Sequence, residues 1–272
     1  TEKRPVAALL YDFDKTLCTK DMQEYGFIPQ IGMEPAEFWE QAEKLAKTEK
    51  MDRILAYMYL MLKRADAGGR PVRREDFVAL GRDVEFYPGV EGWFSRVNAC
   101  GERLGLTVEH YVISSGLREI IEGSAISGHF REVFACAFHY NASGAADWPL
   151  TAVNYTGKTQ YLFRVNKGVL DPSDDVSLNE FLPHDRRPVP FRNMIYIGDG
   201  LTDVPCMRLV KSSGGQSVLL RDGRVDFIAP ADYAENAALD RLVRTMLGKI
   251  ALAGALSDEH AAQINKSRLS AE

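Results

Sequence analysis

Two aspartates, Asp12 and Asp14, stand two residues apart directly after the short apolar run Val6–Tyr11. If that run is a strand, both carboxylates can face one cavity where the chain turns. Like charges this close repel each other unless a cation lies between them or one of them binds a proton. A divalent metal ion removes the repulsion and can also neutralise an incoming phosphate group. An isolated pair of this kind is more often a solvated acidic turn, so the metal-site interpretation depends on further residues.

Residues that could complete a phosphate site occur later in the chain, in three separate places. Ser114 and Ser115 follow a second apolar run and offer hydroxyl and backbone N–H groups to phosphate oxygens. Lys158, in the stretch TGKT, can supply a positive charge at the start of a helix. Asp199 and Asp203 lie in GDGLTD after a third apolar run, where the glycines allow the backbone to approach a ligand closely. Taken singly, the serine is equally well explained as a helix N-cap, and the lysine as a solvated surface residue.

A mostly parallel sheet would bring these distant residues together. Short, continuous apolar runs are typical of strands buried on both faces of such a sheet. The expected strands are Val6–Tyr11, Val108–Ile113, Asn193–Ile197 and Ser217–Leu220, with a further short one at Asp226–Ala229. The helical stretches between them are Val90–Leu104, Leu117–Gly123, Thr159–Val165 and Asp203–Lys211. This alternation predicts an α/β fold, whose ligands bind at the carboxyl ends of the strands.

The segment from residue 19 to residue 86 interrupts the alternation, because it is helical in character and rich in aromatic residues and Met. Helices are expected at Ala36–Lys47, Met51–Lys63 and Arg74–Gly81. We predict that residues 19–86 form a helical cap inserted into a core of residues 1–18 and 87–256, followed by a polar C-terminal tail at 257–272. Most of the cap aromatics should pack inside it, with one or two in contact with substrate: Phe27, Phe38, Trp39, Tyr57 and Tyr59.

Three other segments have recognisable patterns. Apolar-rich runs within Val133–Tyr155 flank the turn-forming cluster Asn141–Gly144, which predicts a hairpin. Leu170–Arg192 contains several Asp and Pro residues and is expected to be an ordered loop. Ala234–Gly254 is expected to be a closing amphipathic helix.

The ordered set D-x-D-x-T, Ser, Lys and G-D-G-x-x-D resembles the haloacid dehalogenase superfamily, and within it the phosphoserine-phosphatase-like branch. Each motif stands after a predicted strand or at a helix start, and together they extend from Asp12 to Asp203. The resemblance implies a three-layer α/β sandwich with a mostly parallel, Rossmann-like sheet and a helical cap over the site. Two departures bear on the substrate. Ser-Ser-Gly replaces the Ser-Gly-Gly of close phosphoserine phosphatases, and the loop at residues 170–192 is longer than usual.

The resemblance also implies catalytic roles. Asp12 corresponds to the nucleophile that forms an aspartyl-phosphate, and Asp14 to the general acid and base. The metal, expected to be Mg²⁺, would be held by the Asp12 and Asp199 carboxylates and by the backbone carbonyl of Asp14. A site made of carboxylates, a carbonyl and waters suits this hard cation.

The remaining motif residues would bind the phosphoryl group or support the residues that surround it. Ser114 and Lys158 correspond to ligands of the transferring phosphoryl group, although Ser115 could replace Ser114. Thr16 would hold the first loop by hydrogen bonds, and Asp203 would be a partner of a metal-bound water or of Lys158.

These roles imply a Mg²⁺-dependent phosphatase that acts on a small phosphomonoester. Asp14 favours this reaction over dehalogenation, because a leaving alkoxide needs a proton and a halide does not. Asp21 stands where phosphoserine-specific relatives bind the substrate amino group, although an acidic residue there is more often a helix cap. Two alternatives remain open: transfer of the phosphoryl group to an acceptor other than water, and a non-catalytic regulatory protein that binds phosphate.

Composition excludes some classes of function and location. A net charge of −5 argues against nonspecific binding to nucleic acid, which needs a basic surface. The four cysteines have no metal-binding or disulfide spacing, which favours reduced thiols in the cytoplasm. No run is long enough to span a bilayer, so no membrane partner is expected. The natural substrate and the oligomeric state cannot be read from the sequence.

Overall fold

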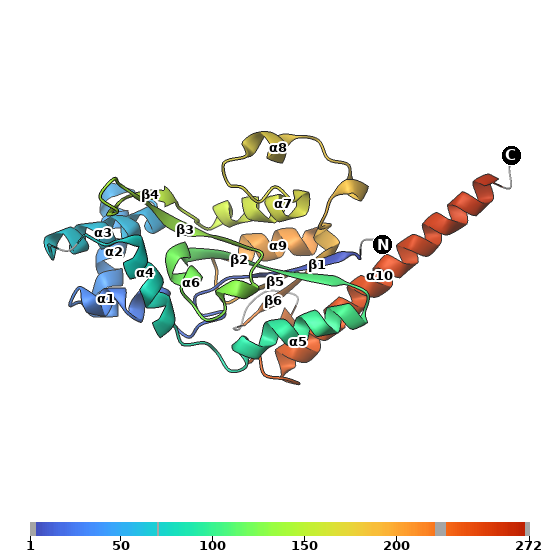
Figure 1. Cartoon of the computed structure of the whole chain (residues 1–272), viewed down its shortest axis with the longest axis horizontal. Coiled ribbons are helices and arrows are strands. Elements are labelled where there is room, and N and C mark those ends of the chain that lie inside the picture. Colours follow the sequence, from blue (N-terminus) through green and yellow to red (C-terminus); the bar gives the residue numbers. More distant parts are fainter. Residues whose placement is uncertain (1–3, 70, 221–226, 270–272) are drawn as a thin grey trace.

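The computed structural model describes residues 4–69, 71–220 and 227–269. They contain one seven-stranded sheet in the order β4-β3-β2-β1-β5-β6-β7 (Figure 1). Only β3 and β4 pair in antiparallel fashion. The strands are β1 (Val6–Tyr11), β2 (Thr107–Leu117), β3 (Glu132–Tyr140), β4 (Ala146–Thr151), β5 (Met194–Gly198), β6 (Gln216–Leu219) and β7 (Phe227–Ile228).

Strand β1 lies at the centre of the sheet, and all six of its residues are buried. It pairs in parallel with β2 on one side and β5 on the other, so that Tyr11 stands opposite Val112 and Ile197. This register aligns the carboxyl ends of the three strands. The loops that follow them therefore meet at one edge of the sheet.

Helices cover both faces of the sheet, as expected of a three-layer α/β sandwich (Figure 1). Helices α5 (Val90–Arg103) and α10 (Ala238–Leu269) pack together on one face. Helices α7 (Thr159–Lys167) and α9 (Val204–Ser212) pack together on the other. The predicted α/β architecture is confirmed.

The segment between β1 and α5 is helical, as predicted. It contains α1 (Phe27–Gln30), α2 (Pro35–Glu49), α3 (Arg53–Ala67) and α4 (Arg74–Leu80), with 3₁₀ turns at Met22–Glu24 and Gly81–Asp83. The β3–β4 hairpin was also predicted, and it packs against this segment. The rings of Phe77 and Phe138 stack with centroids 5.5 Å apart. The short helix α6 (Arg118–Glu122) packs against α4.

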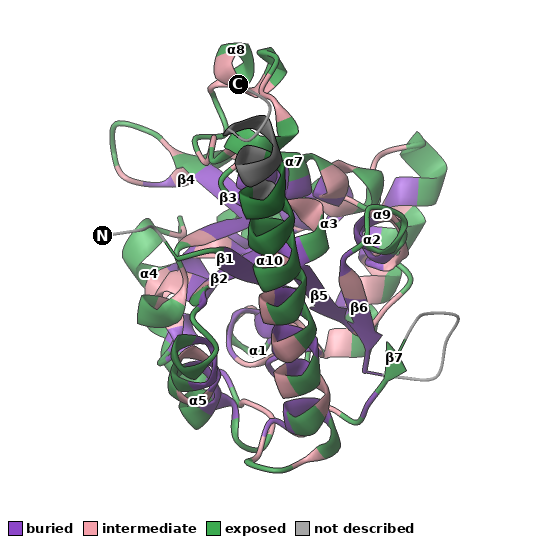
Figure 2. Ribbon diagram, turned by 90° about the vertical axis from the view of Figure 1, so that its right-hand side faces the viewer, coloured by how far each residue is buried: buried purple, intermediate pink, exposed green. Residues whose placement is uncertain are grey.

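Two elements extend beyond their predicted ends. Strand β2 continues past Ile113 to Leu117, with a register shift against β3 between these residues. Helix α10 starts later than predicted and does not stop near Gly254 but continues to Leu269, so residues 257–269 of the predicted tail are helical. The surrounding Ala and Leu residues are strong helix formers and outweigh the roughly 1 kcal/mol that one glycine costs. Figure 2 shows the later turns of α10 as exposed, and in Figure 1 this part of the helix projects beyond the sheet.

The predicted short strand at Asp226–Ala229 is partly confirmed. β7 spans Phe227–Ile228, and Asp226 lies outside the described residues. The predicted loop at 170–192 contains helix α8 (Asp175–Asn179) and 3₁₀ turns at His184–Arg186 and Phe191–Asn193. Among the residues that the structure describes, no helix has the length and apolar character needed to cross a membrane.

Candidate active site

Asp12 is the first residue after β1 and is 6% exposed. Its backbone N–H donates to the carbonyl of Ile197 at 3.0 Å, which ties the loop to β5. Its carboxylate accepts the backbone N–H of Phe13 through Oδ1 at 2.7 Å. The other oxygen, Oδ2, is 3.0 Å from Nζ of Lys158. The strand end thus presents a fixed and nearly buried carboxylate to a lysine from another part of the chain.

The loop after Asp12 is a tight turn around one carbonyl. The carbonyl of Phe13 accepts the backbone N–H groups of Thr16, Leu17 and Cys18, and Lys15 has a positive φ of 56°. The buried hydroxyl of Thr16 has no hydrogen-bond partner among the described residues. Thr16 contributes through its backbone instead, because its carbonyl also accepts the hydroxyl of Tyr233 at 2.9 Å.

Lys158 is completely buried between two carboxylates. Its ammonium lies 2.8 Å from Oδ1 of Asp203 in addition to its contact with Asp12. Both carboxylate oxygens of Asp203 accept further hydrogen bonds. Oδ1 also accepts the hydroxyl of Tyr196 at 2.9 Å. Oδ2 accepts the backbone N–H groups of Asp199 and Gly200 at 3.2 and 3.3 Å. Asp203 therefore holds the lysine in place and is itself held by strand β5.

Burial and charge strongly perturb this cluster. Burial, with the nearby Asp203 carboxylate, raises the pKa of Asp12 to about 7 despite the attraction of Lys158. Burial acts to lower the pKa of Lys158, but the carboxylates of Asp12 and Asp203 outweigh it and raise that pKa. The lysine is therefore held in its charged form. The carboxylates remain in excess of the cations.

The donor set fits a hard divalent cation. One carboxylate oxygen from each of Asp12, Asp199 and Asp203 lies within 4.8 Å of the others. Counted with Lys158, these three carboxylates carry a net charge of −2, which a divalent cation would balance. Asp203 already accepts four hydrogen bonds, from Lys158, Tyr196 and the backbone N–H groups of Asp199 and Gly200.

Asp14 lies next to the cluster but faces a cavity. Its Oδ1 accepts the backbone N–H of Met22 at 2.9 Å. A Cβ at Gly116 would come within 2.8 Å of its Oδ2 and within 2.2 Å of the end of the Met22 side chain, so a side chain there would have to displace both groups. Burial, followed by the charges of Asp21 and Asp12, raises the pKa of Asp14 well above its usual range. Such a group can keep a proton to donate.

The two serines lie at the register shift in β2 and differ in their surroundings. Ser114 is fully buried, and its hydroxyl accepts the backbone N–H of Gly116 at 3.0 Å. Ser115 lines the cavity, but its hydroxyl donates to the carbonyl of Val153 at 2.7 Å. Its own carbonyl accepts the hydroxyl of Tyr57 at 2.7 Å.

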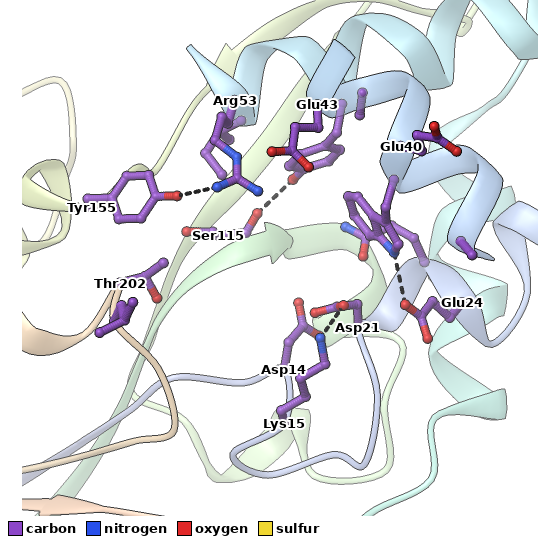
Figure 3. A pocket seen from close by; sticks show the side chains of 17 residues that line it. Asp14, Lys15, Asp21, Glu24, Glu40, Glu43, Arg53, Ser115, Tyr155 and Thr202 are labelled. Atoms are coloured by element: carbon purple, nitrogen blue, oxygen red, sulfur yellow. Dashed lines mark hydrogen bonds and ion pairs between the residues drawn. The ribbon is translucent and has the colours of Figure 1, made fainter. Parts of the chain in front are cut away.

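A cavity of about 870 Å³ opens between the strand ends and helices α2 and α3 (Figure 3). Of the residues singled out from sequence, Asp14, Asp21, Ser115, Trp39 and Tyr57 line it. The other cap aromatics lie elsewhere, with Phe27 and Phe38 buried against each other. Asp21 forms an ion pair with Lys15, so any contact that it makes with a substrate would be shared with that lysine.

Several cavity residues were not anticipated from sequence, namely Gln23, Glu24, Glu40, Glu43, Arg53 and Tyr155. Three of them, Glu40, Glu43 and Arg53, lie on exposed helix positions where polar residues are ordinary, so no signal distinguished them. Tyr196, which supports Asp203, was also missed. A tyrosine within a buried strand needs a partner for its hydroxyl, and that requirement could have revealed it.

A comparison with protein-family models matches residues 9–208 to the haloacid dehalogenase-like hydrolases. The match includes the last three residues of β1, the helical segment and all the motif residues from Asp12 to Asp203. An uncharacterized protein from Borreliella burgdorferi is 26% identical over 235 residues, which cover 78% of this chain and 80% of that protein.

Similar folds occur among solved structures. A HAD family hydrolase from Salmonella enterica serovar Typhi is 15% identical, with a TM-score of 0.59 and coverage of 90% of this chain and 72% of its own. A phosphoserine phosphatase solved with bound substrate is 13% identical, with a TM-score of 0.58 and coverage of 90% of this chain and 99% of its own. At such identities the likeness shows a shared fold.

Proposed function

Because the chain belongs to the haloacid dehalogenase-like hydrolases, we propose that this enzyme is a Mg²⁺-dependent phosphatase that hydrolyses a small phosphomonoester through Asp12. One observation carries the proposal: the buried Lys158 lies 3.0 Å from the Asp12 carboxylate, although 146 positions separate them in sequence (158 − 12). Burying a charged group costs free energy, so a buried lysine indicates a specific role. In this position its positive charge would lie beside the nucleophile and stabilise a phosphoryl group during transfer.

The first step is attack on phosphorus. A carboxylate oxygen of Asp12 forms a bond to the phosphorus of the substrate while the bond from phosphorus to the alcohol oxygen breaks. Lys158 stabilises the charge on the phosphoryl oxygens, with Ser114 as a further ligand. Asp14 gives its proton to the departing alcohol, which its raised pKa supports.

The second step restores the enzyme. Asp14, now ionised, accepts a proton from a water molecule as that water attacks the phosphorus of the aspartyl-phosphate. The bond between Asp12 and phosphorus breaks, inorganic phosphate leaves, and Asp14 is protonated again. Two displacements thus replace one difficult one.

Mg²⁺, held by Asp12 and Asp199 with the backbone carbonyl of Asp14, would neutralise phosphate charge during both steps. The excess of negative charge in the cluster supports this assignment, since three carboxylates surround one lysine. Residues 19–86 would act as a cap on the core of residues 1–18 and 87–256, which the position of the cavity between them supports. We place the enzyme in the cytoplasm, which agrees with its four free cysteines.

Release of inorganic phosphate from an aryl phosphate tests this proposal. We expect turnover with Mg²⁺, at least about a hundredfold less after treatment with EDTA, and recovery when Mg²⁺ is restored. Phosphate release that is unaffected by chelation would contradict the metal assignment. Absence of turnover at any Mg²⁺ concentration, with every aryl phosphate tried, would contradict the phosphatase.

A further inference from the structure

Asn154 holds the turn that carries Lys158. This turn lies between β4 and α7 and includes the 3₁₀ segment Thr156–Lys158. The carbonyl of Asn154 accepts the backbone N–H of Lys158 at 2.8 Å, and its side-chain Oδ1 accepts the backbone N–H of Gly157 at 3.2 Å. A Cβ at Gly157 would come within 2.5 Å of that Oδ1, so a side chain there would displace it. Asn154 therefore fixes the backbone from which the lysine side chain extends.

The side chain of Asn154 also joins this turn to helix α3. Its Nδ2 donates to Oδ2 of Asp52 at 2.8 Å, although 102 positions separate the two residues in sequence. Asp52 is the N-cap of α3, and its Oδ1 accepts the backbone N–H groups of Ile54 and Leu55 at 2.9 and 3.2 Å. Each of the two side chains thus uses one atom for its own turn and the other atom for its partner.

The same end of α3 reaches the cavity. Arg53 and Tyr57 line it, and Arg53 donates to the hydroxyl of Tyr155 at 3.2 Å (Figure 3). Asp52 and Asn154 are not among the residues that line the cavity. The hydrogen bond between them can therefore influence the reaction only through the groups that it holds, of which Lys158 is the charged one.

The position of Lys158 matters because its charge must stand beside the phosphoryl group. Its ammonium is buried, 3.0 Å from the Asp12 carboxylate and 2.8 Å from that of Asp203. Electrostatic stabilisation depends on donors that are held in place before the reaction, and a displacement of about 1 Å can cost about a hundredfold in rate. The two carboxylates fix the charged end of this side chain, and the turn at Asn154 fixes its backbone end.

We propose that Asn154 is a positioning residue of the reaction, which acts through Lys158 and is itself held by its hydrogen bond to Asp52. This inference rests on the proposed phosphatase function. It adds to that function a pair of residues that lie outside the motifs and outside the lining of the cavity. The N-terminal turn of α3, which faces the cavity, thereby also sets the place of the phosphate-binding lysine.

Single substitutions at the two positions test the inference. Asn154→Asp turns the hydrogen bond into two facing carboxylates. Asp52→Asn leaves its NH₂ facing that of Asn154, because its oxygen is needed by the backbone N–H groups of α3. We expect each substitution to lower kcat by about tenfold. One adds a negative charge and the other removes one, so changes of kcat in opposite directions would show an effect of charge and overturn the inference.

The double variant that combines Asp52→Asn with Asn154→Asp restores the bond in reverse. The new NH₂ at position 52 would donate to the new carboxylate at position 154, and each side chain keeps an oxygen for the backbone N–H groups of its own turn. The net charge equals that of the wild type. We expect kcat to return to within about threefold of the wild-type value. A double variant no more active than the weaker single variant would overturn the inference.

A purely structural role would give a different result. It would lower the fraction of folded enzyme and leave the kcat of each folded molecule unchanged. With kcat corrected for the folded fraction by circular dichroism, we expect kcat to fall while KM changes by less than about threefold, since Lys158 still offers its charge to the phosphate. Wild-type kcat in both single variants would overturn the inference. If Asn154→Asp does not fold, Asp52→Asn and the double variant carry the same test.

Asn179→Asp is the matched control. It makes the same exchange of amide for carboxylate at an exposed residue whose Nδ2 donates to the carbonyl of Asp175 at 2.7 Å, and it should keep wild-type kcat. The two proposals fail in different ways. Hydrolysis of aryl phosphate that is equally fast in the wild type and in both single variants would overturn only the positioning role. A wild type that hydrolyses no aryl phosphate in the presence of Mg²⁺ would overturn both.

Discussion

The buried charges at the end of β1 decide what the site can bind. Lys158 contacts two carboxylates, and Asp199 adds a third within 4.8 Å. Removing ions from water is costly unless their charges are balanced. The folded protein should therefore gain stability from a divalent cation, independently of any turnover.

Thermal unfolding measures this gain. We expect Mg²⁺ at 100 times its Kd to stabilise the native state by about 2.7 kcal/mol, because the unfolded chain has no such cluster. Asp199→Asn should remove most of that stabilisation. Asp185→Asn, an exposed position in the loop after α7, should keep it. A shift of equal size in Asp199→Asn and the wild type would show that the ion binds elsewhere.

Gly116 allows the geometry of Asp14 to be tested without altering a reacting group. An alanine there would push against the Asp14 carboxylate and the flexible Met22 side chain. We expect Gly116→Ala to fold but to lose about a hundredfold in kcat, since small displacements of a catalytic group have effects of this size. Gly128→Ala, where a Cβ meets nothing within 4 Å, is the control. Wild-type kcat in Gly116→Ala would mean that the position of Asp14 is not critical.

At the scale of elements, the presence of the strands and helices could be predicted better than the residues at which they begin and end. The apolar run of β1 and the polar residues after it showed a buried strand that ends in a site, because burial on both faces leaves a continuous apolar pattern. The end of β2 at Leu117 could not be predicted, since its last residues are polar and small and pair through an irregular register. Helix α10 continues past its predicted end at Gly254, because the Ala and Leu residues around that glycine sustain the helix.

The loop after α7 is ordered by a side chain that no motif identified. Arg164 is 1% exposed and donates to three loop carbonyls and to the carboxylate of Asp175. We expect Arg164→Met to lower the free energy of unfolding by about 2 kcal/mol, because the acceptors lose a charged donor. Chemical denaturation would measure it. Arg186→Met, at an exposed position of the same loop, should have little effect, and equal losses would show that Arg164 is not the anchor.

At the scale of the whole molecule, the site exists only because distant segments converge. β1 supplies Asp12, the start of α7 supplies Lys158, and the turn after β5 supplies Asp199 and Asp203. Motif order was enough to predict this cluster, because parallel strands carry their polar ends to one edge. The cavity wall could not be predicted in the same way. Glu24, Glu40 and Arg53 are ordinary helix residues in sequence and become neighbours only when the helical segment lies over the sheet.

The most direct test of the account is the turnover of Asp12→Asn against that of the wild type with Mg²⁺ and an aryl phosphate. The substitution keeps the size of the side chain but removes the nucleophilic charge, so we predict a loss of at least about 10³-fold in kcat. Asp171→Asn, at an exposed site, should keep wild-type kcat. If purified Asp12→Asn, shown by circular dichroism to be folded, releases phosphate at a rate near that of the wild type, Asp12 is not the nucleophile.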